Sequence, residues 1–361
     1  MHHRTPSLIL ASGVPTPQPG DPPSPSDPPS PSSSRDGAYR SASSAFDASG
    51  LSRAVAKLAA FEAYSELLAP KSKQPSLLSA AVLIARHANP DANEPACSAA
   101  IDDIVRAVQA ELPPKAYPLR IVNTIVRVMY SGKASGGLGF RGNDTDYSSP
   151  SNSDISLVLE RRTGIPITLS LVFMEVAARL GVPFVGVPFP GHFMCRPSLP
   201  DVEVLVDAFS GTVCTFSEAE AMLSGRLGAP YKLDPQLMDG APMDPRAFLL
   251  RMLNNLRSYY LSNRFVDSAL VIIRYTQATE AGMEVRSYNH LRDEALCLYV
   301  LERWHEAIAV LRQYLELQPA APDAAMIYVL IERLTGLLKA DQEQNAQASR
   351  VEQIVKAEEE S

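Results

Sequence analysis

The sequence predicts an α+β protein in which a small antiparallel sheet lies between two helical regions. Apolar residues recur at three- and four-residue intervals from Leu51 to Tyr130, and again after Pro245, as they do along amphipathic helices. Between these regions lie three short segments, PFVGVPF, HFMCR and VEVLVDAF, which are rich in β-branched and aromatic residues and are separated by proline or glycine. Such segments are typical of strands. Helices that are segregated from one antiparallel sheet define the α+β class.

The composition is that of an ordinary globular protein with reduced thiols. The chain has 361 residues, of which 46% are hydrophobic and 20% charged, so it can form two or three domains with cores of their own. Its net charge of −7 argues against nucleic acid or an anionic membrane as the main partner. No apolar run reaches the roughly 20 residues that span a bilayer. The four cysteines are widely spaced and form no metal-binding motif, so we expect a cytoplasmic protein without metal or cofactor.

Residues 1–48 are predicted to be a disordered tail. Nine of the seventeen residues from Pro15 to Pro31 are proline, and the others are mostly serine and aspartate, so this segment has nothing to bury. The serine-rich composition leaves one alternative open, a transit peptide for a plastid or another organelle. Three aspartates and the scarcity of arginine count against that alternative.

Residues 49–135 are predicted to form a helical subdomain. A periodic run begins at Leu51, a second is LLSAAVLIARHA, and two more follow at Ile101–Leu112 and Leu119–Tyr130. Prolines separate these runs, as they do at helix ends. None of these residues suggests chemistry.

Residues 136–240 are predicted to contain the sheet and the helices that support it. A polar, turn-rich segment leads into a helix near Asp154, and a longer helix follows at Pro166–Leu180, with proline well placed in its first turn. The three strand segments come next. A further helix is expected near Ser217–Ser224.

Residues 241–340 are predicted to be a helical repeat region. Two segments share a pattern of large and small residues, with Ala269 in the first corresponding to Ala307 in the second, 38 positions later. That spacing is close to the 34 residues of a tetratricopeptide repeat. In the second copy Ala295, Ala307 and Pro319 are spaced twelve apart, where this repeat needs close helix packing and then a break.

The first copy departs from the repeat pattern, because Arg257 stands where a small residue is expected. Asp323–Leu338 is predicted to be a terminal capping helix, which the ends of repeat arrays require, and residues 341–361 a frayed helix or tail. A peptide groove on the concave face of the repeats would draw on polar side chains of this region. The candidates are Asn254, Asn255, Arg257 and Arg292.

Two residues of the strand region can act together. His192 opens HFMCRP, and Asp207 closes the next strand, EVLVDAFSG. On neighbouring antiparallel strands the carboxylate can accept a hydrogen bond from one imidazole nitrogen and leave the other free as a general base. A structural alternative stays open for each residue, since histidines in sheets are often only hydrogen-bonded and aspartates often cap turns.

The segment SSPSNSDISLVLERRTGIPITLSLVFMEVAARLGVPFVGVPFPGHFMCR, followed by LVDAFSGT, resembles the SirB-type transglutaminase-like family, and the resemblance covers about residues 50–335. It implies a papain/transglutaminase-like core between a helical N-terminal region and a tetratricopeptide tail. It also implies that His192 and Asp207 hold the His and Asp of a catalytic triad. The nucleophile should then stand at the start of the Pro166–Leu180 helix.

The sequence departs from active members of the superfamily at that helix start. A catalytic cysteine would stand there, where the helix dipole stabilises a thiolate, but the chain has GIPITLS, which offers Thr168 and Ser170 and no thiol. Cys195 lies three positions after His192, and odd spacing along a strand points two side chains to opposite faces. We therefore expect Cys195 in the core. The distance from Cys214 to the histidine cannot be judged from sequence.

Three functions are consistent with these features. The first is a degenerate transglutaminase-like protein that lacks the nucleophile and binds a protein or peptide. The second is an acyl-transfer or hydrolytic enzyme in which His192 and Asp207 activate the hydroxyl of Thr168 or Ser170. The third is an adaptor that binds partners through its repeats, with a passive core. The missing thiol favours the first, a protein without enzymatic activity.

Overall fold

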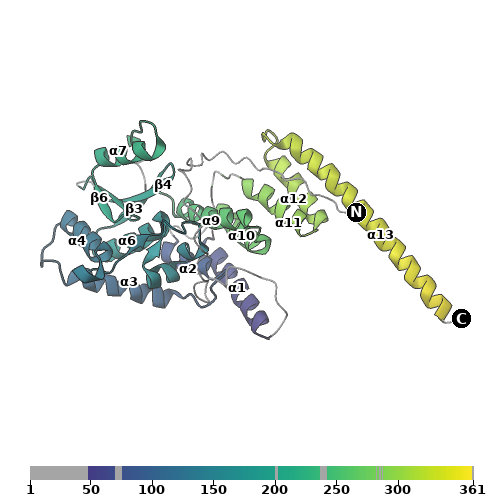
Figure 1. Ribbon diagram of the computed structural model, residues 1–361, viewed down its shortest axis with the longest axis horizontal. Helices are drawn as coiled ribbons and strands as arrows, with labels where there is room; N and C mark the ends of the chain where they lie inside the picture. Colours follow the sequence, from purple (N-terminus) through teal and green to yellow (C-terminus); the bar gives the residue numbers. More distant parts are fainter. Residues whose placement is uncertain are drawn as a thin grey trace, which may run out of the picture. The chain divides into compact units, whose positions relative to one another are not determined.

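The computed structural model describes residues 48–69, 75–199, 202–235, 242–281 and 288–359, together with Met283 and Arg286 (Figure 1). The predicted proline-rich tail, apart from Ala48, falls outside these residues, and so does the targeting role considered for it. The fold is mostly helical with small sheets, which confirms the α+β class.

The N-terminal helices follow the predicted periodicity. Their starts have local causes: the side chain of Asn93 accepts the amide hydrogen of Ala96 at 2.9 Å, and Pro118 occupies the first turn of the fourth helix. The helices are α1 (Ala48–Leu67), α2 (Leu77–Ala85), α3 (Glu94–Gln109) and α4 (Pro118–Tyr130).

Helix α6 (Pro166–Arg179) is the central element of the core. Ten of its fourteen residues are buried, so it is covered on nearly all sides. It contacts α2, α3 and α4, the short helix α5 (Ile155–Arg161), and strands β3 and β4. A two-residue parallel pair, β1 (Arg141–Gly142) with β2 (Thr163–Gly164), precedes its N-terminus.

The main sheet has four antiparallel strands in the order β3-β4-β5-β6. Their bounds are Phe184–Phe189, His192–Pro197, Leu205–Asp207 and Thr212–Cys214. The sequence predicted three strands and missed the fourth, which is too short to show a pattern. The turn before β6 needs glycine at Gly211, because φ is +70° and a Cβ there would lie 2.3 Å from the ring of Tyr130.

The two faces of this sheet pack against different helices. Phe193 and Cys195 belong to the large hydrophobic cluster that includes α6, whereas Met194 and Leu205 pack in a separate cluster with Leu223. Leu223 is part of α7 (Phe216–Leu227). Figure 1 shows α7 above the sheet and α6 below it. Phe193 and Cys195 therefore face the cluster that includes α6, and Met194 faces α7.

The C-terminal region repeats a helical hairpin. Its helices are α9 (Pro245–Ser262), α10 (Val266–Glu280), α11 (Asn289–Val300), α12 (Trp304–Leu317) and α13 (Ala324–Glu359). The turn between α9 and α10 has a left-handed residue, Arg264, and the turn between α11 and α12 has one at Glu302, 38 positions later. The amide–carbonyl hydrogen bonds around these two turns also correspond at this spacing. The predicted 38-residue period is therefore the period of the structure.

The two hairpins are joined by an ion pair that explains the large residue in the first copy. Arg257 of α9 lies 3.5 Å from Asp293 of α11, and both side chains are largely buried. Arg292 pairs with Asp323 at 2.9 Å. Both arginines are thus committed to contacts within the repeats, whereas Asn254 is exposed.

Helix α13 continues through Glu359, so the segment after residue 340, expected to be a frayed helix or tail, is helical. After Gly336 the segment has no proline or glycine and is rich in alanine, glutamine and glutamate, which all favour helix. The large hydrophobic cluster continues across the predicted boundaries at residues 135 and 240. In the part of the chain that the structure describes, no helix is long and apolar enough to cross a membrane.

Candidate functional site

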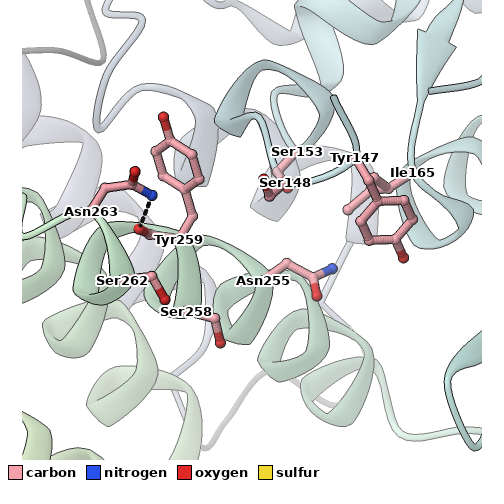
Figure 2. A pocket seen from close by; sticks show the side chains of 9 residues that line it. All are labelled: Tyr147, Ser148, Ser153, Ile165, Asn255, Ser258, Tyr259, Ser262 and Asn263. Carbon is pink, nitrogen blue, oxygen red and sulfur yellow. Dashed lines mark hydrogen bonds between the residues drawn. The ribbon is translucent and has the colours of Figure 1, made fainter. Parts of the chain in front are cut away.

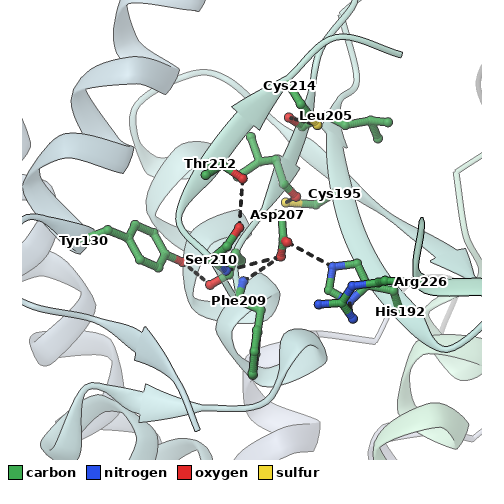
Figure 3. Close-up of polar contacts among 12 residues, drawn as sticks. Tyr130, His192, Cys195, Leu205, Asp207, Phe209, Ser210, Thr212, Cys214 and Arg226 are labelled. Carbon is green, nitrogen blue, oxygen red and sulfur yellow. Dashed lines mark hydrogen bonds and ion pairs between the residues drawn. The ribbon is translucent and has the colours of Figure 1, made fainter. Parts of the chain in front are cut away.

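His192 and Asp207 form a buried pair (Figure 3), on the face of the sheet that also carries Met194 and Leu205 and that meets α7. Cys195 pairs with Val206 across the two strands, so Asp207 lies opposite Met194 and diagonal to His192. Nε2 of the imidazole is 3.1 Å from Oδ2 of the carboxylate, and the two side chains are 0% and 2% exposed. The expected contact between these residues is therefore present.

The carboxylate also holds the turn that follows its strand. Oδ1 of Asp207 accepts the amide hydrogens of Phe209 at 2.9 Å and of Ser210 at 3.4 Å. Burial raises the pKa of Asp207, but the imidazole of His192, the amide of Phe209 and the side chain of Ser210 together lower it by more, so its net pKa lies below the ordinary value of 3.8. Asp207 is thus an ionised group that both caps a turn and orients a histidine.

The other imidazole nitrogen is occupied by an arginine. The guanidinium of Arg226, on α7, lies 3.3 Å from Nδ1 of His192. A guanidinium can only donate hydrogen bonds, so Nδ1 must accept, and the ring proton must lie on Nε2, toward Asp207. Within the described residues, Arg226 is the side chain that hydrogen-bonds Nδ1. The position that a nucleophile would take beside a general base is therefore filled by a cation.

Thr168 lies elsewhere and has a structural task. Its buried hydroxyl donates to the carbonyl oxygens of Asn152 at 2.7 Å and Ile165 at 3.1 Å, and it accepts the amide hydrogen of Ile165 at 3.2 Å. These contacts join the start of α6 to the preceding turn. The structure does not bring this hydroxyl into hydrogen-bond contact with His192.

Ser170 is also remote from the imidazole. It is buried on α6, and its hydroxyl faces the thiol of Cys195 on the opposite side of the sheet from His192. The structure therefore assembles two of the three predicted catalytic residues, His192 and Asp207, and leaves both candidate hydroxyls on the other face.

None of the four thiols is activated. Burial raises the pKa of Cys195 well above its ordinary value and those of Cys97 and Cys214 to about 11 and Cys297 to about 12. Cys195 lies in the core, as its strand position predicted. Cys214 lies on β6 and its thiol contacts the carbonyl oxygen of Leu205 at 3.7 Å, rather than the imidazole.

We expect iodoacetamide to alkylate the native protein slowly. A pKa near 11 leaves roughly a hundredth of the thiolate that an ordinary cysteine has at neutral pH, so Cys214 should react about a hundredfold more slowly than free cysteine. Mass spectrometry over a time course measures this rate. The denatured protein is the control and should react rapidly at four sites. Alkylation of one native thiol as fast as free cysteine would show an activated residue that the structure lacks.

A polar network places Tyr147 beside the pair. The side-chain amide of Asn152 donates to the carbonyl oxygens of Asp146 at 2.7 Å and Tyr147 at 3.2 Å. The carbonyl oxygen of Asn152 in turn accepts from Thr168. The ring of Tyr147 packs against Phe209, with centroids 6.1 Å apart, so it stands next to the turn that Asp207 caps.

A groove of about 320 Å³ separates this loop from α9. Figure 2 shows Tyr147 and Ile165 on one side and Asn255 and Ser258 on the other. The complete lining is Tyr147, Ser148, Ser153, Ile165, Asn255, Ser258, Tyr259, Ser262 and Asn263. Of the polar residues considered for a groove from sequence, Asn255 is one that lines it.

Arg251 is a residue of the site that was not predicted from sequence. Its guanidinium donates to the carbonyl oxygens of His192 at 2.8 Å and Phe189 at 3.4 Å, and it lies 5.4 Å from the ring centre of Phe193. A weak signal was present, because Arg251, Asn255 and the groove serines of α9 recur at four- and three-residue intervals on a helix that is otherwise rich in apolar residues.

Within the described residues, no group of three or more histidine, cysteine, aspartate or glutamate side chains is placed to hold a metal ion. The polar groups of the site are instead two guanidinia, one imidazole, one carboxylate and a phenol. This set can bind and orient an anionic or amide-bearing ligand.

Comparison with known proteins agrees with this architecture. The transglutaminase-like superfamily matches residues 95–254, which include α6, the sheet and the pair. A UPF0162 protein of Xylella fastidiosa (strain Temecula1) is 31% identical over 257 residues, which cover 70% of this chain and 87% of that protein. A UPF0162 protein of Haemophilus influenzae is 24% identical over 238 residues, 66% of this chain and 85% of that protein.

A longer eukaryotic protein is similar over part of its length. Human F-box only protein 21 is 33% identical over 209 residues, which cover 51% of this chain and 32% of that protein. No solved structure matches the chain. The two bacterial matches extend over 87% and 85% of the length of those proteins. The chain belongs to the UPF0162 family of transglutaminase-like proteins.

Proposed function

We propose that this protein has lost transglutaminase-type catalysis and binds a peptide segment in the groove between the Tyr147 loop and α9. The observation that carries the proposal is the contact between Arg226 and Nδ1 of His192. A general base must offer this nitrogen to the proton of a nucleophile. Here the nitrogen accepts from a guanidinium, so the imidazole organises the site and does not abstract a proton.

The candidate hydroxyls add to this argument. A threonine or serine has a far higher pKa than a thiol and depends on direct contact with its base. Thr168 and Ser170 both belong to α6, whereas His192 lies on the face of the sheet under α7. No small rotation of either side chain carries a hydroxyl across a sheet whose core is closely packed.

The groove suits a peptide in size and in chemistry. Its volume of about 320 Å³ is within the range of ligand sites in proteins. Asn255, Ser258 and Ser262 can donate and accept hydrogen bonds with peptide groups, and Tyr147 and Tyr259 offer aromatic faces for side chains.

The groove also joins the two regions that could bind a partner. One wall comes from the transglutaminase-like core and the other from α9, the first helix of the 38-residue repeats. We assign these repeats to the tetratricopeptide type, and the chain to the SirB-type branch, on the spacing of their small residues and on the SSPSNSD–GHFMCR segment. The repeats then serve as one wall of a composite site rather than as a separate adaptor.

The full-length protein should retain peptides from a bead-displayed library of random heptapeptides. The variant Ser258→Trp adds an indole to the groove wall at an exposed position, and we expect it to weaken binding of the selected peptides by at least about tenfold. Fluorescence anisotropy with resynthesised peptides measures the affinities. Gln313→Trp, at an exposed position on α12, is the matched control and should bind like the wild type.

Two results would contradict the proposal. One is equal binding by Ser258→Trp and the wild type, which would place the peptides outside the groove. The other is release of ammonia from a glutamine-containing peptide and an amine by the wild type, and its loss in His192→Ala that remains folded by circular dichroism. That result would establish the enzymatic alternative with a hydroxyl nucleophile.

A further inference from the structure

Two arginines stand beside His192, and neither has a carboxylate partner among the described residues. Arg226 of α7 contacts the imidazole at 3.3 Å, and Arg251 of α9 donates to the carbonyl oxygen of His192 at 2.8 Å. Arg257 and Arg292, by contrast, each form an ion pair with an aspartate. The two arginines at the site therefore keep charge that an anionic ligand can neutralise.

The local charge is positive in a chain that is acidic overall. Asp207 contributes one negative charge, and the two guanidinia contribute two positive charges. The excess of one positive charge contrasts with a net charge of −7 for the whole chain. Arg251 is half-buried, so its charge is held away from water without an opposite charge beside it.

Arg251 lies one turn of α9 before Asn255, which lines the groove, and Arg226 is placed near Arg251 by their common contact with His192. Burial raises the pKa of Tyr147, and the charges of Arg251 and Arg226 both lower it, so the two cations lie close to the phenol that lines the groove. They come from different elements, α7 and α9. An oxyanion between them would meet two planar guanidinia, each of which can bind a carboxylate through two parallel hydrogen bonds.

Building on the proposed function, we infer that the groove recognises the carboxyl terminus of a peptide, with its α-carboxylate bound by Arg226 and Arg251. The rest of the peptide lies along α9. Arg251, Asn255, Ser258 and Ser262 follow one another at four- and three-residue intervals, so they share one face of that helix. From the first to the last, this face measures about 16 Å, which matches about five residues of extended peptide.

The position of the β3–β4 turn explains why the end of a peptide fits the groove better than an internal segment. Arg251 binds the carbonyl oxygens of Phe189 and His192, which flank this turn, so α9 meets the turn there. A peptide running along α9 toward the arginines has to end or bend away at that point. The remaining polar lining is neutral asparagine and serine, which suits the uncharged backbone of the preceding residues.

Two matched libraries of random heptapeptides test this inference on the full-length protein. One library carries free C-terminal carboxylates and the other C-terminal amides. We expect retention of free-acid peptides, and conversion of a selected peptide to its amide should weaken binding by at least about tenfold, because a charge-assisted contact to two guanidinia is lost. Fluorescence anisotropy measures each affinity, and inorganic phosphate is titrated separately.

The variants Arg226→Gln and Arg251→Gln should each weaken binding of the free-acid peptide by about tenfold and leave the affinity for the amide peptide unchanged. Arg312→Gln, at an exposed position on α12, is the control and should bind both peptides like the wild type. Equal affinity for acid and amide would overturn the inference while the peptide-binding function stands. Binding of phosphate without binding of either library would overturn both.

Discussion

Replacing Asp207 with asparagine is expected to lower the free energy of unfolding by about 3 kcal/mol at neutral pH, the scale seen when one partner of a buried ionic pair is removed. One carboxylate oxygen lies 3.1 Å from Nε2 of the imidazole, and the other accepts hydrogen bonds from two backbone amides. An asparagine side chain has only one oxygen. In either orientation its NH2 group therefore faces a donor, which is either the imidazole of His192 or the backbone amides of Phe209 and Ser210. Moving the ring proton of His192 to Nδ1 does not remove this conflict, because the guanidinium of Arg226 and Nδ1 would then both be donors.

The loss should depend on pH in a defined direction. The pKa of Asp207 in the folded protein lies below 3.8. The stabilisation by its charge is therefore complete above the unfolded value and disappears as the pH falls through the folded pKa. The difference in stability between the wild type and Asp207→Asn should be constant near neutrality and shrink below about pH 4.

Urea unfolding followed by circular dichroism measures both effects. Asp91→Asn, at an exposed position, is the matched control and should stay within about 0.5 kcal/mol of the wild type at every pH. If Asp207→Asn were as stable as the control at neutral pH, the pair would not hold the turn and the histidine together as the structure shows.

Replacing Thr168 with valine is expected to cost about 1–3 kcal/mol, because it keeps the shape of the side chain and removes a buried hydroxyl that joins two backbone groups. The carbonyl oxygen of Asn152 and the amide of Ile165 then lose a partner. Asn152 also holds the Tyr147 loop, so amide hydrogen exchange should accelerate over residues 146–152. Thr168→Ser, which keeps the hydroxyl, should lose less than half as much.

Ser170→Ala is the control on the same helix with the same burial. Its hydroxyl faces a thiol and joins no backbone groups across elements, so we expect a change within about 1 kcal/mol and unchanged exchange in the Tyr147 loop. A fully stable Thr168→Val with an unaltered loop would remove the structural role assigned to this hydroxyl. It would return Thr168 to consideration as a nucleophile.

Much of the fold could be read from local patterns. Helices such as α4 and α6 have an apolar period and a proline in the first turn, and these signals act within a few residues. Strands β3 and β4 are long enough to show their composition. Strands β1, β2 and β6 have two or three residues, and they exist because distant segments meet, so no local pattern reveals them.

The repeat period was also readable, because the left-handed turn residues Arg264 and Glu302 and the small residues around them recur in the chain itself. The departure at Arg257 was visible, but its reason was not. Only the packing of α9 against α11 brings Asp293 beside it. An ion pair between two elements is fixed by their placement and leaves no trace in either segment alone.

The sequence by itself predicted that His192 and Asp207 lie close together, because neighbouring antiparallel strands have few registers in which both residues lie on one face. The missing thiol at the start of α6 was equally plain. Only the tertiary structure decided what surrounds the pair. Packing over the sheet carries Arg226 to Nδ1, and packing of α9 against the core brings Arg251 and the groove to the same point. Such contacts depend on where whole helices come to rest, and that is set by the shared core rather than by any local run of residues.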